Sequence, residues 1–271
     1  MATKYLLRIL ILMLFPLTLT TCTKDGKVNI FSLDDDIKLG RQVRDEIAAN
    51  PTQYPILDKT QYASSYAFLE QMRDKILNSG EVDNKDRFEW QVFIVRDDST
   101  LNAFVTPGGY IYVYTGLIKF LDNEDQLAGV MGHEIAHADK RHSTTNLTKQ
   151  YGVSLLLDVI FGQNSSGLSS ITKDIAGGLS ALSFSRATES EADEFSVIYL
   201  SKTSYQCSGA AGFFEKIESQ GGNDQPVWLS THPDPENRVG AINGKAAELG
   251  CSTVVNTNVT EYQAFKNSLP Q

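Results

Sequence analysis

One short stretch of the 271-residue chain constrains its fold more than any other, the pattern His133-Glu134-Ile135-Ala136-His137. Residues four apart lie on the same face of an α-helix, so the two imidazoles converge on one point. Two such imidazoles supply half of a tetrahedral metal site. Glu134 follows the first histidine directly, which is the position of the general base in zinc peptidases with an HExxH pattern. The stretch therefore predicts a metal-bearing helix.

Both ends of this helix are signalled in the sequence. Asn123 is a favourable N-cap, and Gln126 three residues later can complete a capping box. Basic residues in the last turn suit the negative end of the helix dipole. His142 is one of these. We assign it to the helix end and not to the metal, because it follows His133 without the glycine turn of the metzincin pattern.

A third metal ligand is expected from an acidic residue on a second helix further along the chain. Residues 185–193 offer it, because Glu189 and Asp193 are four apart and share a helix face. We expect Glu189 to bind the metal and Asp193 to accept the second N–H of a ligand histidine, which fixes its tautomer. Glu191 lies on another side of the same helix and is expected to face away.

The charge of the chain excludes one class of partner. The sequence holds 33 acidic and 24 basic residues, for a formal charge of −9. Nucleic-acid binding needs concentrated Lys and Arg, and the sequence has no basic cluster. We therefore expect no nucleic-acid partner.

The first 21 residues have the features of a lipoprotein-type signal peptide. Two basic residues precede an apolar run of signal-peptide length, which is too short to be a convincing membrane-spanning helix. The run ends in LTTC at residues 19–22, which resembles a lipobox, with Thr21 where a smaller residue is usual. We expect Cys22 to carry a lipid, and ordinary secretion or a retained anchor are the alternatives. Each places the folded part outside the cytoplasm. We favour a periplasm-facing lipoprotein of the outer membrane.

The two remaining cysteines form an even pair in a compartment that permits disulfides. A bridge between Cys207 and Cys251 would close a loop of about 45 residues, which the chain-entropy model values at about 4 kcal/mol. Two buried free thiols are the alternative.

The mature chain divides into a tether at residues 22–33, one metallopeptidase domain at 34–255 and a tail at 256–271. Apolar periodicity and stop signals predict helices and a strand in the domain. The helices are expected at 37–49, 64–77, 210–219 and 239–249, and the strand at 88–95. Residues 143–183 are harder to interpret, because a lid of two helices over the cleft and an ordinary helical connection are equally compatible with them.

Residues 101–117 form a strand, a Pro-Gly-Gly turn and a second strand. A plain hairpin is one interpretation. The other is that one strand lies at the sheet edge beside the metal helix and pairs with an extended substrate. The residues expected to bind substrate are Asn102, Ala103, Phe104, Gly108 and Gly109.

Four segments together resemble one family of enzymes. HEIAH at 133–137, SRATESEAD at 185–193, the hairpin at 101–117 and STHP at 230–233 resemble zinc metallopeptidases (gluzincins) of the HtpX-like and CaaX-prenyl-protease type, in particular their soluble periplasmic lipoprotein branch. The resemblance runs from about residue 37 to 249. It implies an α+β fold, a mainly helical zincin-like domain with a small, mostly antiparallel sheet beside the HExxH helix.

The resemblance also implies the chemistry. It assigns one zinc ion per chain to His133, His137 and Glu189, and it makes Glu134 the base that activates the attacking water. His232 then points into the cleft, where it either stabilises the oxyanion or occupies the open metal position as a self-inhibiting switch. Arg238 is expected to position this loop, and Asp193 to orient a ligand histidine.

The resulting hypothesis is a zinc metalloendopeptidase. Its expected substrates are unfolded or misassembled envelope proteins, which suits a role in protein quality control. The competing hypothesis is a latent or non-catalytic envelope lipoprotein that acts as a chaperone or assembly factor. The sequence leaves the oligomeric state open.

Overall fold

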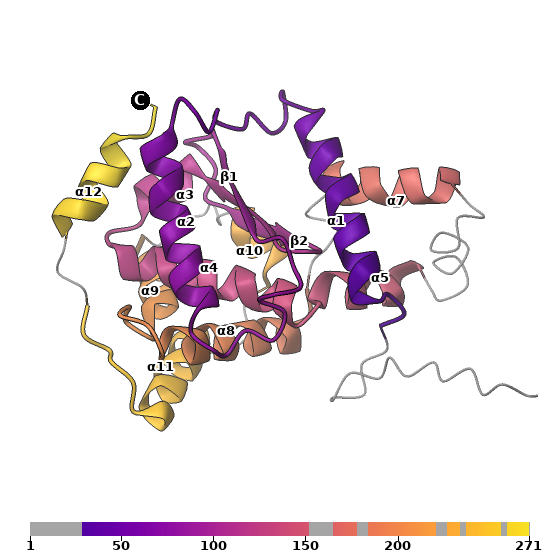
Figure 1. Cartoon of the computed structure of the whole chain (residues 1–271). Helices are drawn as coiled ribbons and strands as arrows, with labels where there is room; N and C mark the ends of the chain where they lie inside the picture. The colour runs from indigo at the N-terminus through magenta and orange to yellow at the C-terminus, as the bar shows by residue number, and fades with distance from the viewer. Residues whose placement is uncertain are drawn as a thin grey trace, which may run out of the picture.

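Helices dominate the chain, and a small sheet lies among them (Figure 1). The computed structural model describes residues 29–151, 165–177, 184–220, 227–233, 237–255 and 259–270. The helices in these residues are α1 (Leu33–Ala48), α2 (Ala63–Leu77), α3 (Thr115–Phe120), α4 (Glu124–Asp139), α5 (His142–Tyr151), α7 (Ser165–Gly177), α8 (Arg186–Leu200), α9 (Gly209–Gln220), α10 (Val227–Thr231), α11 (Arg238–Leu249) and α12 (Val259–Asn267). The strands are β1 (Gln91–Val95), β2 (Ala103–Thr106) and β3 (Tyr110–Tyr114).

The sheet has the strand order β1-β3-β2, so β2 is an edge strand. The predicted α+β class, with a small sheet beside the HExxH helix, is confirmed. The sheet is mixed, however, and not mostly antiparallel, because β1 runs parallel to β3 while β2 runs antiparallel to it. The chain reverses after β1 and again at the Pro-Gly-Gly turn, so the first and third strands point the same way. β1 is also shorter than predicted, because the positive φ of Trp90 (44°) interrupts the extended backbone before Gln91.

The HExxH helix α4 crosses the middle of the molecule, with the sheet on one side and α8 on the other (Figure 1). Every one of its residues is buried. The Asn123 side chain accepts a hydrogen bond from the Gln126 N–H at 3.0 Å, as the sequence predicts. The Gln126 side chain accepts from the N–H of Asp122 and not from that of Asn123, so the reciprocal half of the capping box is shifted by one residue.

Helix α1 is tied to the end of α4 by a buried ion pair. Ser32 caps α1 in a full capping box with Asp35, so the helix begins a turn earlier than predicted. Asp36 is buried, and its Oδ2 accepts from Nε of Arg141 at 2.5 Å. Arg141 lies between α4 and α5 with a positive φ of 59°.

Two stretches that the sequence describes only loosely, 143–183 and 256–271, pack against different parts of the fold. Within the stretch 143–183, α7 packs against α1, where the Tyr54 hydroxyl donates to the carbonyl of Ala176 at 2.7 Å. The segment 256–271, predicted as a tail, contains α12, whose Tyr262 and Phe265 lie in the main hydrophobic core. The Tyr262 hydroxyl donates to the carbonyl of Ile118 on α3 at 2.8 Å. The predicted signal peptide and Cys22 lie outside the described residues.

Cys207 and Cys251 are joined by a disulfide with an S–S distance of 1.99 Å. The bridge connects the segment between α8 and α9 to the end of α11, and the Cys207 N–H donates to the carbonyl of Ser252 beside it. The link holds α11 against α8 and α9.

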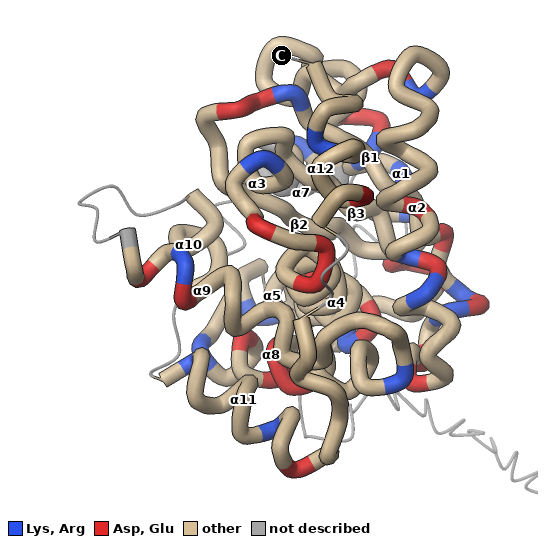
Figure 2. Tube along the Cα trace, turned by 90° about the vertical axis from the view of Figure 1, so that its left-hand side faces the viewer, with Lys and Arg blue, Asp and Glu red and all other residues tan. Residues whose placement is uncertain are grey.

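Charged residues of both signs are interspersed along the chain. In Figure 2, the Lys and Arg positions of the described trace lie among Asp and Glu positions. None of the described helices combines the length and the apolar character that a membrane-spanning segment needs.

The contact between α4 and α9 yields a stability prediction. A Cβ added at Gly129 would meet the backbone N of Ala210 at 2.0 Å, whereas one added at the exposed Gly244 of α11 meets nothing within 4 Å. We expect Gly129→Ala to lower the free energy of unfolding by roughly 1–3 kcal/mol through overpacking. Gly244→Ala should raise it by roughly 0.5–1 kcal/mol through helix propensity. Urea unfolding of both variants measures these two changes in the free energy of unfolding. Changes of the same sign and size in the two variants would contradict the close packing of Gly129 against α9.

Candidate metal centre

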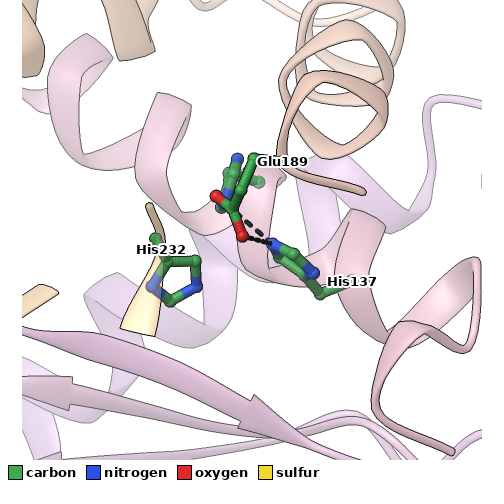
Figure 3. Close-up of side chains that lie close together, drawn as sticks. His137, Glu189 and His232 are labelled. Carbon is green, nitrogen blue, oxygen red and sulfur yellow. Dashed lines mark hydrogen bonds and ion pairs between the residues drawn. The ribbon is translucent and has the colours of Figure 1, made fainter. Parts of the chain in front are cut away.

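Helix α4 presents His133 and His137 on one buried face. Their Nε2 atoms lie 2.9 Å apart, as the spacing of four residues requires. The fully buried Glu189 of α8 faces both of them. Its Oε2 lies 3.3 Å from Nε2 of His133 and its Oε1 lies 3.4 Å from Nε2 of His137 (Figure 3). The structure therefore brings together the three residues predicted to bind the metal.

The close approach of α4 and α8 makes this geometry possible. The Ser196 hydroxyl of α8 donates to the carbonyl of Gly129 at 2.8 Å. A Cβ at Gly132 would lie 2.8 Å from the same hydroxyl. Gly132 thus leaves the space in which α8 approaches α4 closely enough for Glu189 to reach the histidines.

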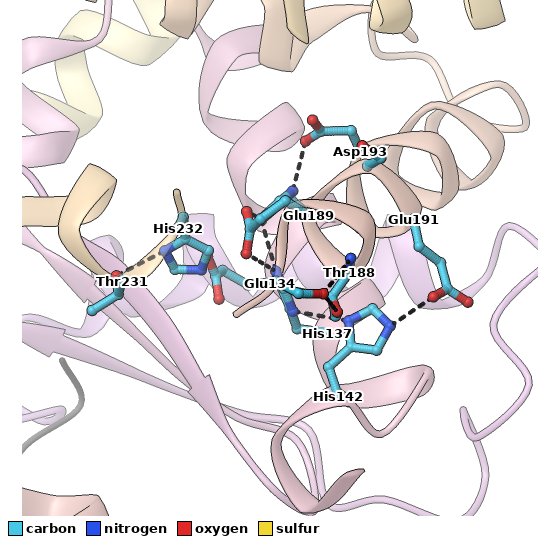
Figure 4. A network of polar contacts seen from close by, with 12 residues as sticks. Glu134, His137, His142, Thr188, Glu189, Glu191, Asp193, Thr231 and His232 are labelled. Atoms are coloured by element: carbon cyan, nitrogen blue, oxygen red, sulfur yellow. Dashed lines mark hydrogen bonds and ion pairs between the residues drawn. The ribbon is translucent and has the colours of Figure 1, made fainter. Parts of the chain in front are cut away.

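Asp193 and Arg238 support the first histidine from behind. Oδ1 of Asp193 lies 2.8 Å from Nδ1 of His133, as predicted for an orienting residue (Figure 4). Arg238 donates to both oxygens of Asp193, at 2.6 and 2.8 Å, and to Oε2 of Glu189 at 3.1 Å. Arg238 therefore holds the two acidic residues of α8 rather than only the His232 loop that the sequence suggested.

His232 follows α10 and points its Nε2 towards the same centre (Figure 3). One ligand atom from each of His133, His137, Glu189 and His232 lies within 4.8 Å of the other three. On its other side, Nδ1 of His232 lies 2.9 Å from the Thr231 hydroxyl and 3.2 Å from the carbonyl of Trp228.

These groups fit a zinc ion. The donor separations of 2.9–3.4 Å bracket the edge of a zinc-centred tetrahedron with N and O ligands, roughly 3.3 Å. Among the described residues, Oε1 of Glu189 and Nε2 of His232 are buried without a hydrogen-bond partner.

The ionisation of the cluster also favours a cation. Burial lowers the pKa of His133, but Asp193 and Glu189 outweigh burial and raise it to about 9, so these carboxylates attract positive charge to this ring. Burial and the neighbouring His133 lower the pKa of His137 well below its ordinary value. Burial does the same for His232. His137 and His232 are therefore neutral imidazoles, which is the form in which histidine binds a metal.

Two aromatic residues of the site, Trp228 and Phe184, were not predicted from the sequence. Trp228 is buried and stacks on His232 with ring centroids 4.2 Å apart, and Phe184 stacks on His137 at 4.1 Å. The available signals were the spacing of four between Trp228 and His232 and the position of Phe184 directly before the acidic helix. A contact of His142 with His137, with Nδ1 atoms 2.9 Å apart, was not predicted either.

The residues predicted to bind substrate separate into two groups. Asn102, Ala103 and Phe104 lie at the start of the edge strand β2, which packs beside α4. Gly108 and Gly109 form the turn at the other end of the strand with positive φ. There they pack against α1 and Trp90, so the turn has a structural role.

Comparisons with known proteins agree with this site. A family model described as peptidase family M48 matches residues 65–246. The chain is 30% identical over 212 residues to the mitochondrial metalloendopeptidase OMA1 of Saccharomyces cerevisiae, covering 73% of this chain and 58% of that protein. It is 32% identical over 160 residues to a putative beta-barrel assembly-enhancing protease of Vibrio cholerae (54% and 32%). The identity to the beta-barrel assembly-enhancing protease of Escherichia coli K12 is 29% over 177 residues (61% and 36%). The chain spans less than two thirds of each of these relatives.

Zinc binding should be visible in the stability of the protein. Zinc that binds only the folded chain stabilises it by about 4 kcal/mol at 1,000 times its Kd. For a domain of this size we expect a rise in Tm of roughly 10 °C relative to chelator-treated protein. Glu189→Gln should lose most of this shift, whereas Glu194→Gln, the same substitution at an exposed position of α8, should keep it. A wild-type shift in Glu189→Gln would contradict the ligand assignment.

Proposed function

The chain belongs to peptidase family M48, and from this premise we propose that it is a zinc-dependent endopeptidase. The observation that carries the proposal is the position of Glu134. Its buried carboxylate lies on α4 between the two histidines, in the same polar network as Glu189 (Figure 4). A metal ion that activates water, with a general base beside it, is sufficient to hydrolyse a peptide bond.

His133, His137 and Glu189 would hold the metal. Zinc bound there supplies Lewis-acid chemistry, since it polarises a peptide carbonyl and acidifies water. Glu134 accepts the proton of the attacking water and passes it to the departing amine. Arg238 keeps Glu189 and Asp193 in place during both steps.

The surroundings of Glu134 suit a group that must act as both base and acid. Burial raises the pKa of Glu134 to about 8. The Trp228 indole N–H donates to Oε1 at 3.4 Å, and Oε2 has no hydrogen-bond partner among the described residues. In the structure as it stands, Trp228 thus holds one carboxylate oxygen of Glu134, and the other makes no hydrogen bond to the described part of the chain.

The edge strand β2 is the proposed platform for an extended substrate. β2 is an edge strand that packs beside α4, so a polypeptide that paired with Ala103 and Phe104 would run past Glu134. In the structure, the N–H of Trp228 donates to the carbonyl of Leu101, just before β2, at 3.2 Å. Helix α10 therefore covers the start of the platform.

His232 supports the interpretation that this closed arrangement is self-inhibited. The carbonyl of Trp228 can only accept a hydrogen bond, so Nδ1 of His232 carries the ring proton. Nε2 then presents a lone pair to the metal position, as a fourth ligand does and as an oxyanion donor cannot. His232 would have to leave, together with α10, before a substrate binds.

The proposed substrates are extended or misfolded envelope proteins. This proposal is supported by the lipoprotein-like sequence up to Cys22 and by the names of the beta-barrel assembly-enhancing relatives. It places the chain in the periplasmic lipoprotein branch, with Cys22 as the anchor in the outer membrane. A latent lipoprotein that acts as an assembly factor is the second candidate, because α10 covers the start of β2.

Replacing the base tests the enzyme proposal. We expect Glu134→Gln to keep a full equivalent of zinc and to lose at least about 10²-fold in casein cleavage, because glutamine cannot accept a proton. The measurement is the initial rate of proteolysis of unfolded casein, with zinc content determined for each preparation. Equal rates for the variant and the wild type would exclude the proposed chemistry. If neither protein cleaves casein, the assembly-factor candidate gains support.

Removing the histidine that closes the site tests self-inhibition. We expect His232→Ala to raise the rate of casein cleavage about tenfold, which corresponds to about 1.4 kcal/mol of closed-state stabilisation. Ser230→Ala, at an exposed position of α10, is the control and should leave the rate unchanged. A loss of activity in His232→Ala would instead assign His232 to transition-state stabilisation.

A further inference from the structure

Two residues outside the predicted site form a chain of contacts to the second ligand histidine. His142 begins α5 and is buried, and its Nδ1 lies 2.9 Å from Nδ1 of His137. Its other ring nitrogen, Nε2, lies 3.3 Å from Oε2 of Glu191 on α8 (Figure 4). The order is Glu191, His142, His137 and then the metal position. Both placements differ from what the sequence suggests: His142 begins α5 instead of ending α4, because α4 stops at Asp139, and Glu191 turns towards His142 instead of away from the site.

The donors and acceptors along this chain can be assigned. A neutral His137 that offers Nε2 to a metal carries its proton on Nδ1, so this nitrogen is a donor. Nδ1 of His142 must then accept, which leaves the proton of His142 on Nε2. With this assignment the protonated Nε2 of His142 lies 3.3 Å from Oε2 of Glu191, an electrostatic approach and not a hydrogen bond. In the reverse order His137 would carry its proton on Nε2 and could not bind a metal there, and Nε2 of His142 would turn a lone pair towards the carboxylate.

We infer that His142 and Glu191 are positioning residues that hold His137 in the tautomer and orientation required for metal binding. The first ligand histidine already has such a support, because Asp193 and Arg238 hold Nδ1 of His133. The inference rests on the metal role proposed for His137. Helix α8 would then supply one metal ligand, Glu189, and two carboxylates that orient the ligand histidines. Asp193 orients His133 directly, and Glu191 orients His137 through His142.

The local backbone explains why His142 can reach His137. Arg141 has a positive φ of 59° directly after α4, which reverses the chain so that the next side chain points back at the helix it has left. The ion pair between Arg141 and Asp36 holds this turn. Phe184 stacks on the His137 ring at 4.1 Å and limits its rotation.

Zinc affinity measured by competition with a chromogenic chelator tests the inference. Loss of a residue that orients a ligand histidine lowers metal affinity by roughly 10- to 100-fold. We expect this loss in His142→Phe, which keeps an aromatic ring but has no acceptor, and a smaller loss in Glu191→Ala. Glu194→Ala, on the same helix and ion-paired with Lys245 at the surface, is the matched control and should bind zinc as the wild type does.

Rescue separates positioning from a general structural role. His142→Gln offers a side-chain oxygen that can accept from His137, so its zinc affinity should lie closer to the wild type than that of His142→Phe, while the Tm values of the zinc-free proteins stay similar. Wild-type affinity in both His142→Phe and Glu191→Ala would overturn the inference. If His142→Phe does not fold, the partly exposed Glu191→Ala decides alone. Because zinc affinity is read without peptide cleavage, an inactive protein would refute the proposed function and leave this test intact.

Discussion

The close contact between α4 and α8 is the interaction on which the rest of the site depends. Gly132 lets the backbone of α4 approach Ser196, and the hydrogen bond from the Ser196 hydroxyl to the carbonyl of Gly129 fixes the two helices at this distance. Metal ligands from two helices can meet only if the helices themselves meet. The surrounding sheet, α9 and α11 hold this pair of helices in place and bury it.

Burial of this contact also means that the charged side chains between the two helices must be compensated by opposite charges. Charged groups are costly to bury unless each one is paired. Burial raises the pKa of Asp193, but Arg238 and His133 outweigh it and lower that pKa below its ordinary value, so Asp193 is ionised in the core. Oε1 of Glu189 and Nε2 of His232 face the centre of the cluster without a hydrogen-bond partner among the described residues, and a bound cation would satisfy both. The site is thus both a stabilised part of the core and a place where a metal is needed to complete it.

The sequence predicted those parts of the site that depend on local periodicity. The spacing of four within HExxH and between Glu189 and Asp193 is a property of single helices, and both pairs lie as predicted. The position of His142 depends on the left-handed turn at Arg141, which is held by Asp36 from a distant part of the chain. Trp228 lies on a five-residue helix, which is too short to show periodicity. The parallel pairing of β1 with β3 likewise depends on how separated segments meet.

The hydrogen bond between Trp228 and Leu101 has a consequence for the choice of substrates. If β2 is the substrate platform proposed above, an incoming peptide would compete with α10, which belongs to the same chain and acts at an effective concentration on the order of millimolar. Short peptides with few contacts would lose this competition. Long unfolded chains, which can pair along the whole strand and rebind at many places, would win it. A tethered competitor of this kind would select substrates by length and disorder, without any pocket that recognises a particular side chain.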